Sequence, residues 1–116
     1  MLAQAHRLRR SADFSSAMRR GRRCGSRLAV VYVAAARATE LSDAAGSWRA
    51  GLVVSKAVGN SVVRHRVARR LRHILASELP KTAEARDVVV RALGPAASAD
   101  YKELERAVGK CLRQAA

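Results

Sequence analysis

The stretch that decides the fold runs from Lys56 to Arg72 and reads K-A-V-G-N-S-V-V-R-H-R-V-A-R-R-L-R. Its apolar residues recur at the spacing of one helix face and continue just beyond it, at Val63, Val67, Leu71, Ile74 and Leu75. Gly59-Asn60-Ser61 is a start signal, because Asn or Ser can cap free N–H groups and Gly permits a sharp turn. We therefore predict a helix that begins near Asn60 and runs to Leu79, where Pro80 stops it.

The other side of this helix is basic. At about 100° per residue, the side chains that point away from the apolar stripe are His65, Arg66, Arg69, Arg72 and His73, with Arg64 and Arg70 on the flanks. No acid occurs between Asp43 and Glu78, so the like charges on the helix repel one another and no neighbouring carboxylate neutralises them. A helix start and forked guanidinium donors both suit phosphate, so we interpret this face as an anion-binding surface.

Charge and length limit the classes of protein that fit. The chain has 116 residues, enough for one domain, and a net charge of +14 that predicts a polyanionic partner, most simply nucleic acid. The longest apolar run, Leu28 to Ala36, is too short to span a membrane, and no signal peptide is evident, so we expect a cytoplasmic protein without a membrane partner. Cys24 and Cys111 have no neighbours at metal-ligand spacing and are expected to be free thiols.

The remaining elements follow from periodicity. We expect a basic arm over 1–10, a helix capped by Ser11 and ending near Gly21, and strands over 27–36, 48–55 and 87–93. The first two strands are expected to pair antiparallel across a mobile loop at 37–47, and a last helix spans 99–115. Gly51 in mid-strand suggests a bulge or a close backbone approach. The order α-β-β-α-β-α predicts an α+β fold, a two-layer α/β sandwich in which helices pack on a small mixed sheet.

We find no catalytic constellation and no metal site in the sequence. The acids are dispersed, and His65 and His73 lie among arginines with no acid beside them. Aromatic residues are scarce, and Phe14 and Tyr32 are the candidates for stacking on an unpaired strand. Phe14 and Met18 fit ordinary core contacts equally well.

Residues 55–72 resemble the signature of the protein subunit of bacterial ribonuclease P. Three other segments agree with it: the basic stretch 7–14 that ends in Asp13-Phe14, the strand that ends in Val31-Tyr32, and 87–90. The resemblance covers about 7–112. It implies the fold of a ribosomal-protein domain (ribosomal protein S5 domain 2-like), with a left-handed βαβ crossover that departs from the usual right-handed rule.

The resemblance also implies a function. Such a protein assists a catalytic RNA that removes the 5′ leader from precursor tRNA, one protein to one RNA, and the RNA with its Mg²⁺ ions performs the hydrolysis. The residues carried over as contacts to the catalytic RNA are Lys56, Asn60, Arg64, His65, Arg66, Arg69, Arg70 and Arg72. Those carried over as contacts to the leader are Phe14, Met18 and Tyr32.

The chain departs from the family pattern at several positions. The usual Arg-Asn-Arg core reads Arg64-His65-Arg66, and Ala57 and Ala68 stand where basic residues are common. In addition, Arg70 replaces an apolar residue and Met18 replaces an aromatic one. Two other classes stay open on the residues alone: a non-catalytic RNA-binding or ribosome-associated protein, and a DNA-binding module. Against the DNA-binding module, the basic helix lacks the paired preceding helix of a helix-turn-helix unit.

Overall fold

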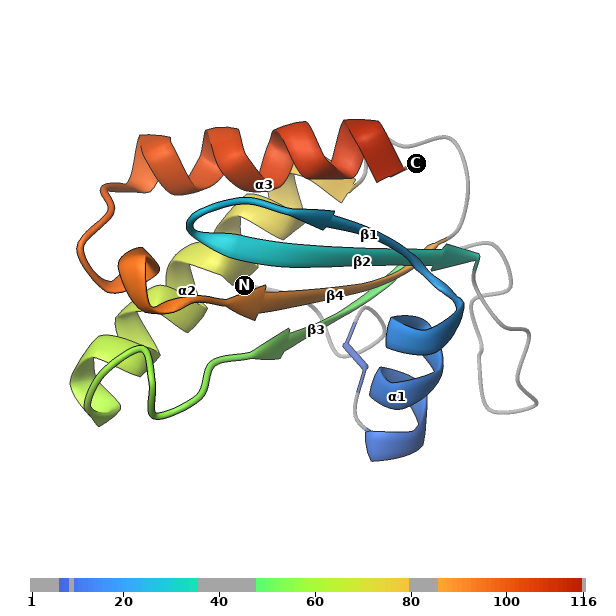
Figure 1. The fold of residues 1–116 in the computed structure, drawn as a ribbon, viewed down its shortest axis with the longest axis horizontal. Coiled ribbons are helices and arrows are strands. Elements are labelled where there is room, and N and C mark those ends of the chain that lie inside the picture. The colour runs from blue at the N-terminus through green and yellow to red at the C-terminus, as the bar shows by residue number, and fades with distance from the viewer. Residues whose placement is uncertain (1–6, 9, 36–47, 80–85, 116) are drawn as a thin grey trace.

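The structure is a computed structural model that describes residues 7–8, 10–35, 48–79 and 86–115. The expected loop at 37–47, Pro80 and most of the N-terminal arm lie outside the described residues. In chain order the elements are α1 (Ser11–Arg20), β1 (Arg22–Gly25), β2 (Ala29–Ala35), β3 (Arg49–Val53), α2 (Ser61–Glu78), β4 (Arg86–Ala92), the short 3-10 helix η3 (Gly94–Ala97) and α3 (Tyr101–Ala115). This is the mixed α+β architecture that the sequence predicts (Figure 1).

The four strands lie in the order β1-β2-β4-β3. β2 pairs antiparallel with β1 and with β4, whereas β3 pairs parallel with β4. The predicted antiparallel pairing of 27–36 with 48–55 is therefore wrong, because β4 lies between these strands. Val88, Val89 and Val90 of β4 are fully buried, as expected for a strand that is covered on both faces.

The sequence analysis does not predict the strand β1. Its residues Arg22, Arg23, Cys24 and Gly25 show no apolar alternation, and three of the four are exposed. It forms a hairpin with β2 and occupies an edge of the sheet, where short and charged strands are tolerated. Ser11 is the first residue of α1 and does not cap it, since Arg10 holds the cap position without a side-chain hydrogen bond.

The β3–α2–β4 unit is the βαβ crossover that contains the deciding stretch. Gly59 has φ of 155°, and a Cβ there would lie 2.9 Å from Cγ1 of Val63, so only glycine suits this turn. The backbone N–H of Val63 donates to Oδ1 of Asn60 at 3.0 Å, which confirms the predicted cap. Helix α2 therefore starts at a fixed point directly after β3.

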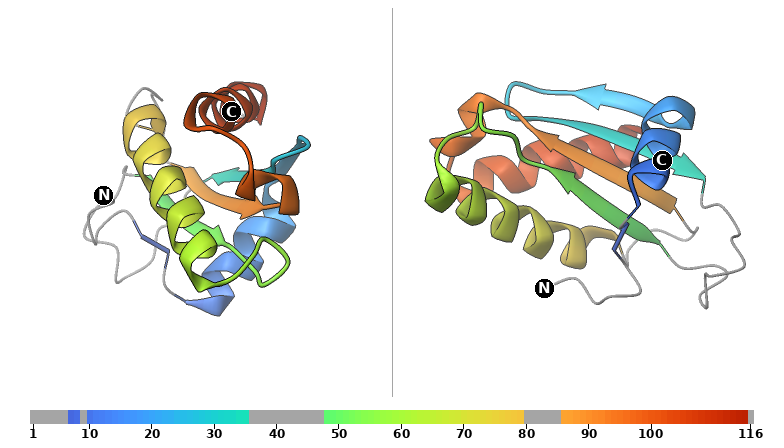
Figure 2. Two further views of the ribbon diagram at one scale, coloured as in Figure 1. Left: turned by 90° about the vertical axis from the view of Figure 1, so that its left-hand side faces the viewer. Right: turned by 90° about the horizontal axis from the view of Figure 1, so that it is seen from below.

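The helices cover the two faces of the sheet unequally. α2 and α3 lie on one face and enclose the main core, in which Val67, Leu71, Ile74 and Leu75 are fully buried (Figure 2). α1 lies on the other face and covers a smaller apolar cluster of Leu8, Ala17, Ala34 and Val89. The predicted apolar stripe of α2 is thus confirmed as its contact with the core.

Residues 7 and 8 are not part of an exposed arm. Arg7 forms a parallel bridge to Ala50, and the backbone N–H of Leu8 donates to the carbonyl of Ala50 at 2.9 Å. Leu8 is buried, so this expectation is wrong for the two residues. Their contact covers the start of the outer edge of β3, which pairs along its other edge with β4.

A buried ion-pair network joins α1 to the sheet. Asp87 is 1% exposed and accepts two hydrogen bonds from Arg49, each 3.1 Å long. Arg20 lies 3.5 Å from the same carboxylate, and Asp13 lies 3.9 Å from Arg49. The hydrogen bonds from Arg49 to Asp87 raise the pKa of Arg49, which favours the charged form of its guanidinium. The network fixes α1 on the sheet, because removing one partner would leave a buried charge unpaired.

Cys24 and Cys111 form a disulfide between β1 and α3, so the expectation of free thiols is wrong. The sequence offers no signal for this pair, since 87 residues separate the two cysteines. The fold brings their Cα atoms to 5.3 Å because α3 packs against β1 and β2. The bond ties the C-terminal helix to the edge strand of the sheet.

We predict that reduction of this disulfide destabilises the protein. A link that closes a loop of this length removes entropy from the unfolded chain, and its loss should lower the free energy of unfolding by roughly 2–4 kcal/mol. Urea titrations with and without reductant measure the change. A Cys24→Ser, Cys111→Ser double variant should be insensitive to reductant. Equal unfolding midpoints for the unsubstituted protein in the two conditions would contradict the prediction.

Candidate nucleic-acid interface

Helix α2 distributes its cationic side chains over three sides. Arg64 and Arg72 lie on the side that faces β3, and Arg66 and Arg70 lie on the side that faces η3 and α3. The exposed cationic or imidazole side chains between them are His65, Arg69 and His73. The four arginines on the flanks are half-buried. The sequence analysis predicts that Arg66 and Arg72 both lie on the outer face of the helix. This prediction is wrong, because Arg66 faces η3 and Arg72 faces β3.

The physical reason is the position of the helix. α2 lies in the angle between β3 and α3, so protein covers its flanks as well as its apolar stripe. Side chains one turn apart share a flank, which pairs Arg66 with Arg70. The basic surface therefore wraps around the exposed half of the helix.

Arg66 and Arg70 hold the connection that precedes α3. One guanidinium nitrogen of Arg66 donates to the carbonyl of Ala97, and one of Arg70 donates to the carbonyl of Ala99, both at 3.0 Å. Arginine has five N–H donors, so each side chain retains donors for another acceptor. These two residues thus have a structural role in addition to any contact with RNA.

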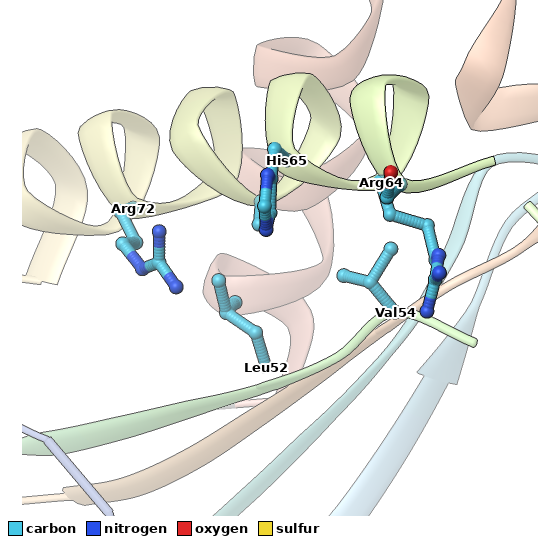
Figure 3. Close-up of a pocket in the computed structure, with 7 residues that line it drawn as sticks. Leu52, Val54, Arg64, His65 and Arg72 are labelled. Atoms are coloured by element: carbon cyan, nitrogen blue, oxygen red, sulfur yellow. The ribbon is translucent and has the colours of Figure 1, made fainter. Parts of the chain in front are cut away.

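Arg64 and Arg72 line a groove between α2 and β3 (Figure 3). Its volume is about 300 Å³. The lining residues are Leu52, Val54, Ser61, Arg64, His65, Ala68 and Arg72. In the close-up, Arg64, His65 and Arg72 reach down from the helix toward β3, and Leu52 and Val54 rise toward them. The groove therefore combines cationic walls with an apolar floor.

The cations of α2 are not neutralised within the described part of the chain. The ion pairs found there involve Arg20, Arg27 and Arg49, and none involves an arginine of α2. Unpaired positive charge at this density attracts a polyanion and makes its binding sensitive to salt. This arrangement fits a backbone of phosphates.

Lys56 and Asn60 lie at the start of the same surface and are both exposed. Lys56 belongs to the turn that leads into α2, where its carbonyl accepts from the N–H of Gly59 at 3.2 Å. The Oδ1 of Asn60 is used by the helix cap. Only the amide nitrogen of this side chain is left as a donor for RNA.

Phe14, Met18 and Tyr32 come together on the opposite face of the sheet. All three are half-buried and pack against the small apolar cluster under α1. The ring of Phe14 lies over Gly51, where a Cβ would be only 2.3 Å from its Cζ. The close approach expected at Gly51 is therefore confirmed, and it is made by this aromatic ring.

Two arginines near Tyr32 were not among the predicted site residues. Arg23 is the direct partner of Tyr32 in β1, and Arg91 is the partner of Val30 in β4. Side chains that are paired across strands share a face, so both arginines lie on the face of Tyr32, and both are exposed. The alternation of Asp87, Val89 and Arg91 could have placed the second of them.

The described residues contain no group of three or more His, Cys, Asp or Glu side chains that could hold a metal ion. Among these residues no helix is long and apolar enough to cross a membrane. Two surfaces are therefore the candidate binding sites. One is the cationic half of α2, which carries Arg64, His65, Arg66, Arg69, Arg70, Arg72 and His73, and the other is the apolar patch under α1, formed by Phe14, Met18 and Tyr32.

The chain has clear relatives. The family model for ribonuclease P matches residues 2–116. A ribonuclease P protein component from Rhodococcus opacus is 53% identical over 107 residues, which cover 91% of this chain and 85% of the relative. One from Nocardia farcinica is 49% identical and covers 98% of this chain and 83% of the relative.

Solved structures agree in fold. The RNase P protein of Staphylococcus aureus has a TM-score of 0.81 at 26% identity and covers 97% of this chain and 96% of its own. The RNase P protein of Thermotoga maritima has a TM-score of 0.74 and covers 93% of this chain and 96% of its own. Its identity is 20%, so this second likeness concerns the fold alone.

We predict that Arg69→Ala weakens RNA binding without unfolding the protein. Arg69 is exposed and makes no hydrogen bond or ion pair within the described chain, so its loss removes about one phosphate contact and reduces the slope of log K against log salt by about one unit. Arg66→Ala should change the slope similarly and also lower stability by about 1 kcal/mol, because the bond to Ala97 is lost. Filter binding over a salt series and thermal unfolding measure the two effects. Equal slopes for Arg69→Ala and the unsubstituted protein would show that this side chain faces water in the complex.

We also predict that Gly51→Ala displaces the ring of Phe14. The new methyl group would overlap the ring, and overpacking of this kind costs about 1–3 kcal/mol. Urea unfolding measures the cost, and the change at Phe14 is visible in aromatic NMR signals. Gly25→Ala is the matched control, since nothing lies within 4 Å of a Cβ built there. Similar losses of stability in the two variants would contradict this account of Gly51.

Proposed function

This chain belongs to the ribonuclease P protein family, and we propose that it binds the catalytic RNA of that ribonucleoprotein through the cationic half of α2. Membership makes it a component of an endoribonuclease that acts in tRNA 5′ processing. The observation that carries the proposal is that α2 presents its arginines without any carboxylate partner among the described residues. A folded RNA would supply the missing negative charge through its phosphates.

The contacts we assign to the catalytic RNA follow the three sides of the helix. Arg69 points outward, Arg64, His65 and Arg72 bind from the groove, and Lys56 extends the surface toward the turn. Arg66 and Arg70 bind RNA with the donors that Ala97 and Ala99 leave free. His65 supplies an imidazole where the family usually has an amide, and an imidazole can stack on a base as well as donate a hydrogen bond.

We assign the 5′ leader of precursor tRNA to the apolar patch on the other face. Phe14 and Tyr32 offer aromatic faces for bases, and Met18 adds a polarisable neighbour. The exposed Arg23 and Arg91 beside Tyr32 would bind the phosphates of the same strand. The leader and the catalytic RNA would thus bind to opposite faces of one sheet.

The hydrolysis itself is assigned to the RNA and its Mg²⁺ ions. The described residues offer no group of carboxylate, imidazole or thiol ligands for a metal, and the surface near α2 is strongly cationic, which repels Mg²⁺. The ion would supply Lewis-acid chemistry when it is bound to the RNA. The protein contributes binding and orientation, as one protein to one RNA, in the cytoplasm.

Reconstitution tests this proposal. We predict that the purified protein alone cleaves nothing, and that it lowers the Mg²⁺ concentration at which its cognate catalytic RNA removes the leader from a precursor tRNA. An Arg64→Ala, Arg69→Ala double variant should lose the stimulation, whereas Lys110→Ala, on the exposed side of α3, should keep it. The readout is the rate of leader release over a Mg²⁺ series.

Two results would contradict the proposal. One is the absence of any stimulation by the unsubstituted protein. The other is a pull-down from cells that returns ribosomal RNA in place of one catalytic RNA, which would favour a ribosome-associated RNA-binding protein.

A further inference from the structure

The groove between α2 and β3 has a composition that simple phosphate binding does not explain. Its floor is formed by Leu52 and Val54, which are only half-buried, so apolar surface stays in contact with water. Phosphate offers only negative charge and hydrogen-bond acceptors, so a site that binds phosphate alone gains nothing from apolar surface. The groove therefore suits a ligand that has an apolar part as well as charge.

The cations stand at the two ends of this apolar floor. Arg64 and Arg72 are eight residues apart on the helix, which corresponds to about 12 Å along its axis. His65 hangs between them toward the floor, as Figure 3 shows. The order along the groove is thus cation, imidazole with apolar floor, and cation.

A nucleotide inside an RNA strand has the matching order. Its base is a flat surface that can stack on an imidazole or lie on aliphatic side chains, and a phosphate stands on either side of it. The volume of about 300 Å³ is at the lower end for small-molecule pockets, enough for one nucleotide and not for a helix. Ser61 at one end adds a hydroxyl that can reach a ribose or a phosphate.

The guanidinium of Arg64 is also not committed to the protein. Its Nε is buried and has no hydrogen-bond acceptor among the described residues, and neither Arg64 nor Arg72 has an ion-pair partner there. A buried donor without an acceptor costs free energy, and a ligand that draws the guanidinium toward the groove can relieve that cost.

We propose that this groove binds one unpaired nucleotide of the partner RNA, with its base on Leu52 and Val54 beside His65 and its two flanking phosphates on Arg64 and Arg72. The inference rests on the proposed function, because it takes the ligand to be part of the catalytic RNA. It deepens that function by assigning a defined base site to the groove between α2 and β3.

The experiment compares three probes by NMR titration of the full chain at low salt. Adenosine 3′,5′-bisphosphate carries a base between two phosphates, adenosine 5′-monophosphate carries one phosphate, and pyrophosphate carries no base. We expect the bisphosphate to bind most tightly and to shift the methyl signals of Leu52 and Val54. Equal binding of pyrophosphate, or shifts that avoid those methyl groups, would overturn the proposal.

Variants locate the charge contacts. Arg64→Gln and Arg72→Gln should each weaken the bisphosphate about tenfold, the effect expected for one charge-assisted hydrogen bond. Lys110→Gln on α3 removes the same charge away from the groove and should leave the affinity unchanged. Equal losses in all three variants would mean that net charge alone is sensed, and would overturn the proposal. Thermal unfolding of each variant confirms that it is folded.

A last arm identifies the source of the nucleotide. Saturation with the catalytic RNA should shift the same methyl signals and block the bisphosphate. If the RNA binds and stimulates cleavage while the bisphosphate still enters the groove, the proposed function stands and this inference fails. If the RNA does not bind at all, the proposed function itself fails.

Discussion

The structure depends on one constraint, which is that the apolar stripe of α2 must be buried on the sheet. Val67, Leu71, Ile74 and Leu75 are fully buried, and no other face of this helix could supply such a contact. Once the stripe is fixed, the helical repeat fixes the direction of every other side chain. Arg64 and Arg72 then face β3, Arg66 and Arg70 face α3, and Arg69 faces solvent. The same burial that stabilises the fold therefore arranges the cationic surface.

The strand β3 connects the two surfaces that we assign to RNA. It is short and lies at the edge of the sheet, and its successive residues point to opposite faces. Gly51 and Val53 lie on the side of α1, where Gly51 makes room for Phe14. Leu52, and Val54 just after the strand, lie on the side of α2 and form the floor of the groove. One strand thus separates the leader patch from the groove, and a shift of β3 would affect both.

The parts of this arrangement that could be predicted are those set by a local or periodic pattern of residues in the sequence. The cap at Asn60, the stripe of α2 and the sharp turn at Gly59 follow from local patterns, since each depends on residues within a few positions of one another. The position of β4 between β2 and β3 could not be predicted, because pairing partners depend on the whole sheet. The disulfide and the Asp87–Arg49 pair were missed for the same reason, as each joins residues that only the folded chain brings together. The flanks of α2 were misplaced because the position of α3 was unknown.

The distribution of carboxylates explains why the arginines of α2 stay without ion-pair partners among the described residues. With only nine acids against 23 lysines and arginines, most cations must stay unpaired. Asp87 and Asp13 both lie near Arg49, whose side chain is largely buried, and Asp87 also pairs with the exposed Arg20. Glu103, in the first turn of α3, lies near Arg27. Among the described residues none of these acids forms an ion pair with an arginine of α2, so the positive charge of these arginines stays unneutralised. A polyanion that approaches the protein is attracted to the side where the groove and Arg69 lie, before any specific contact forms.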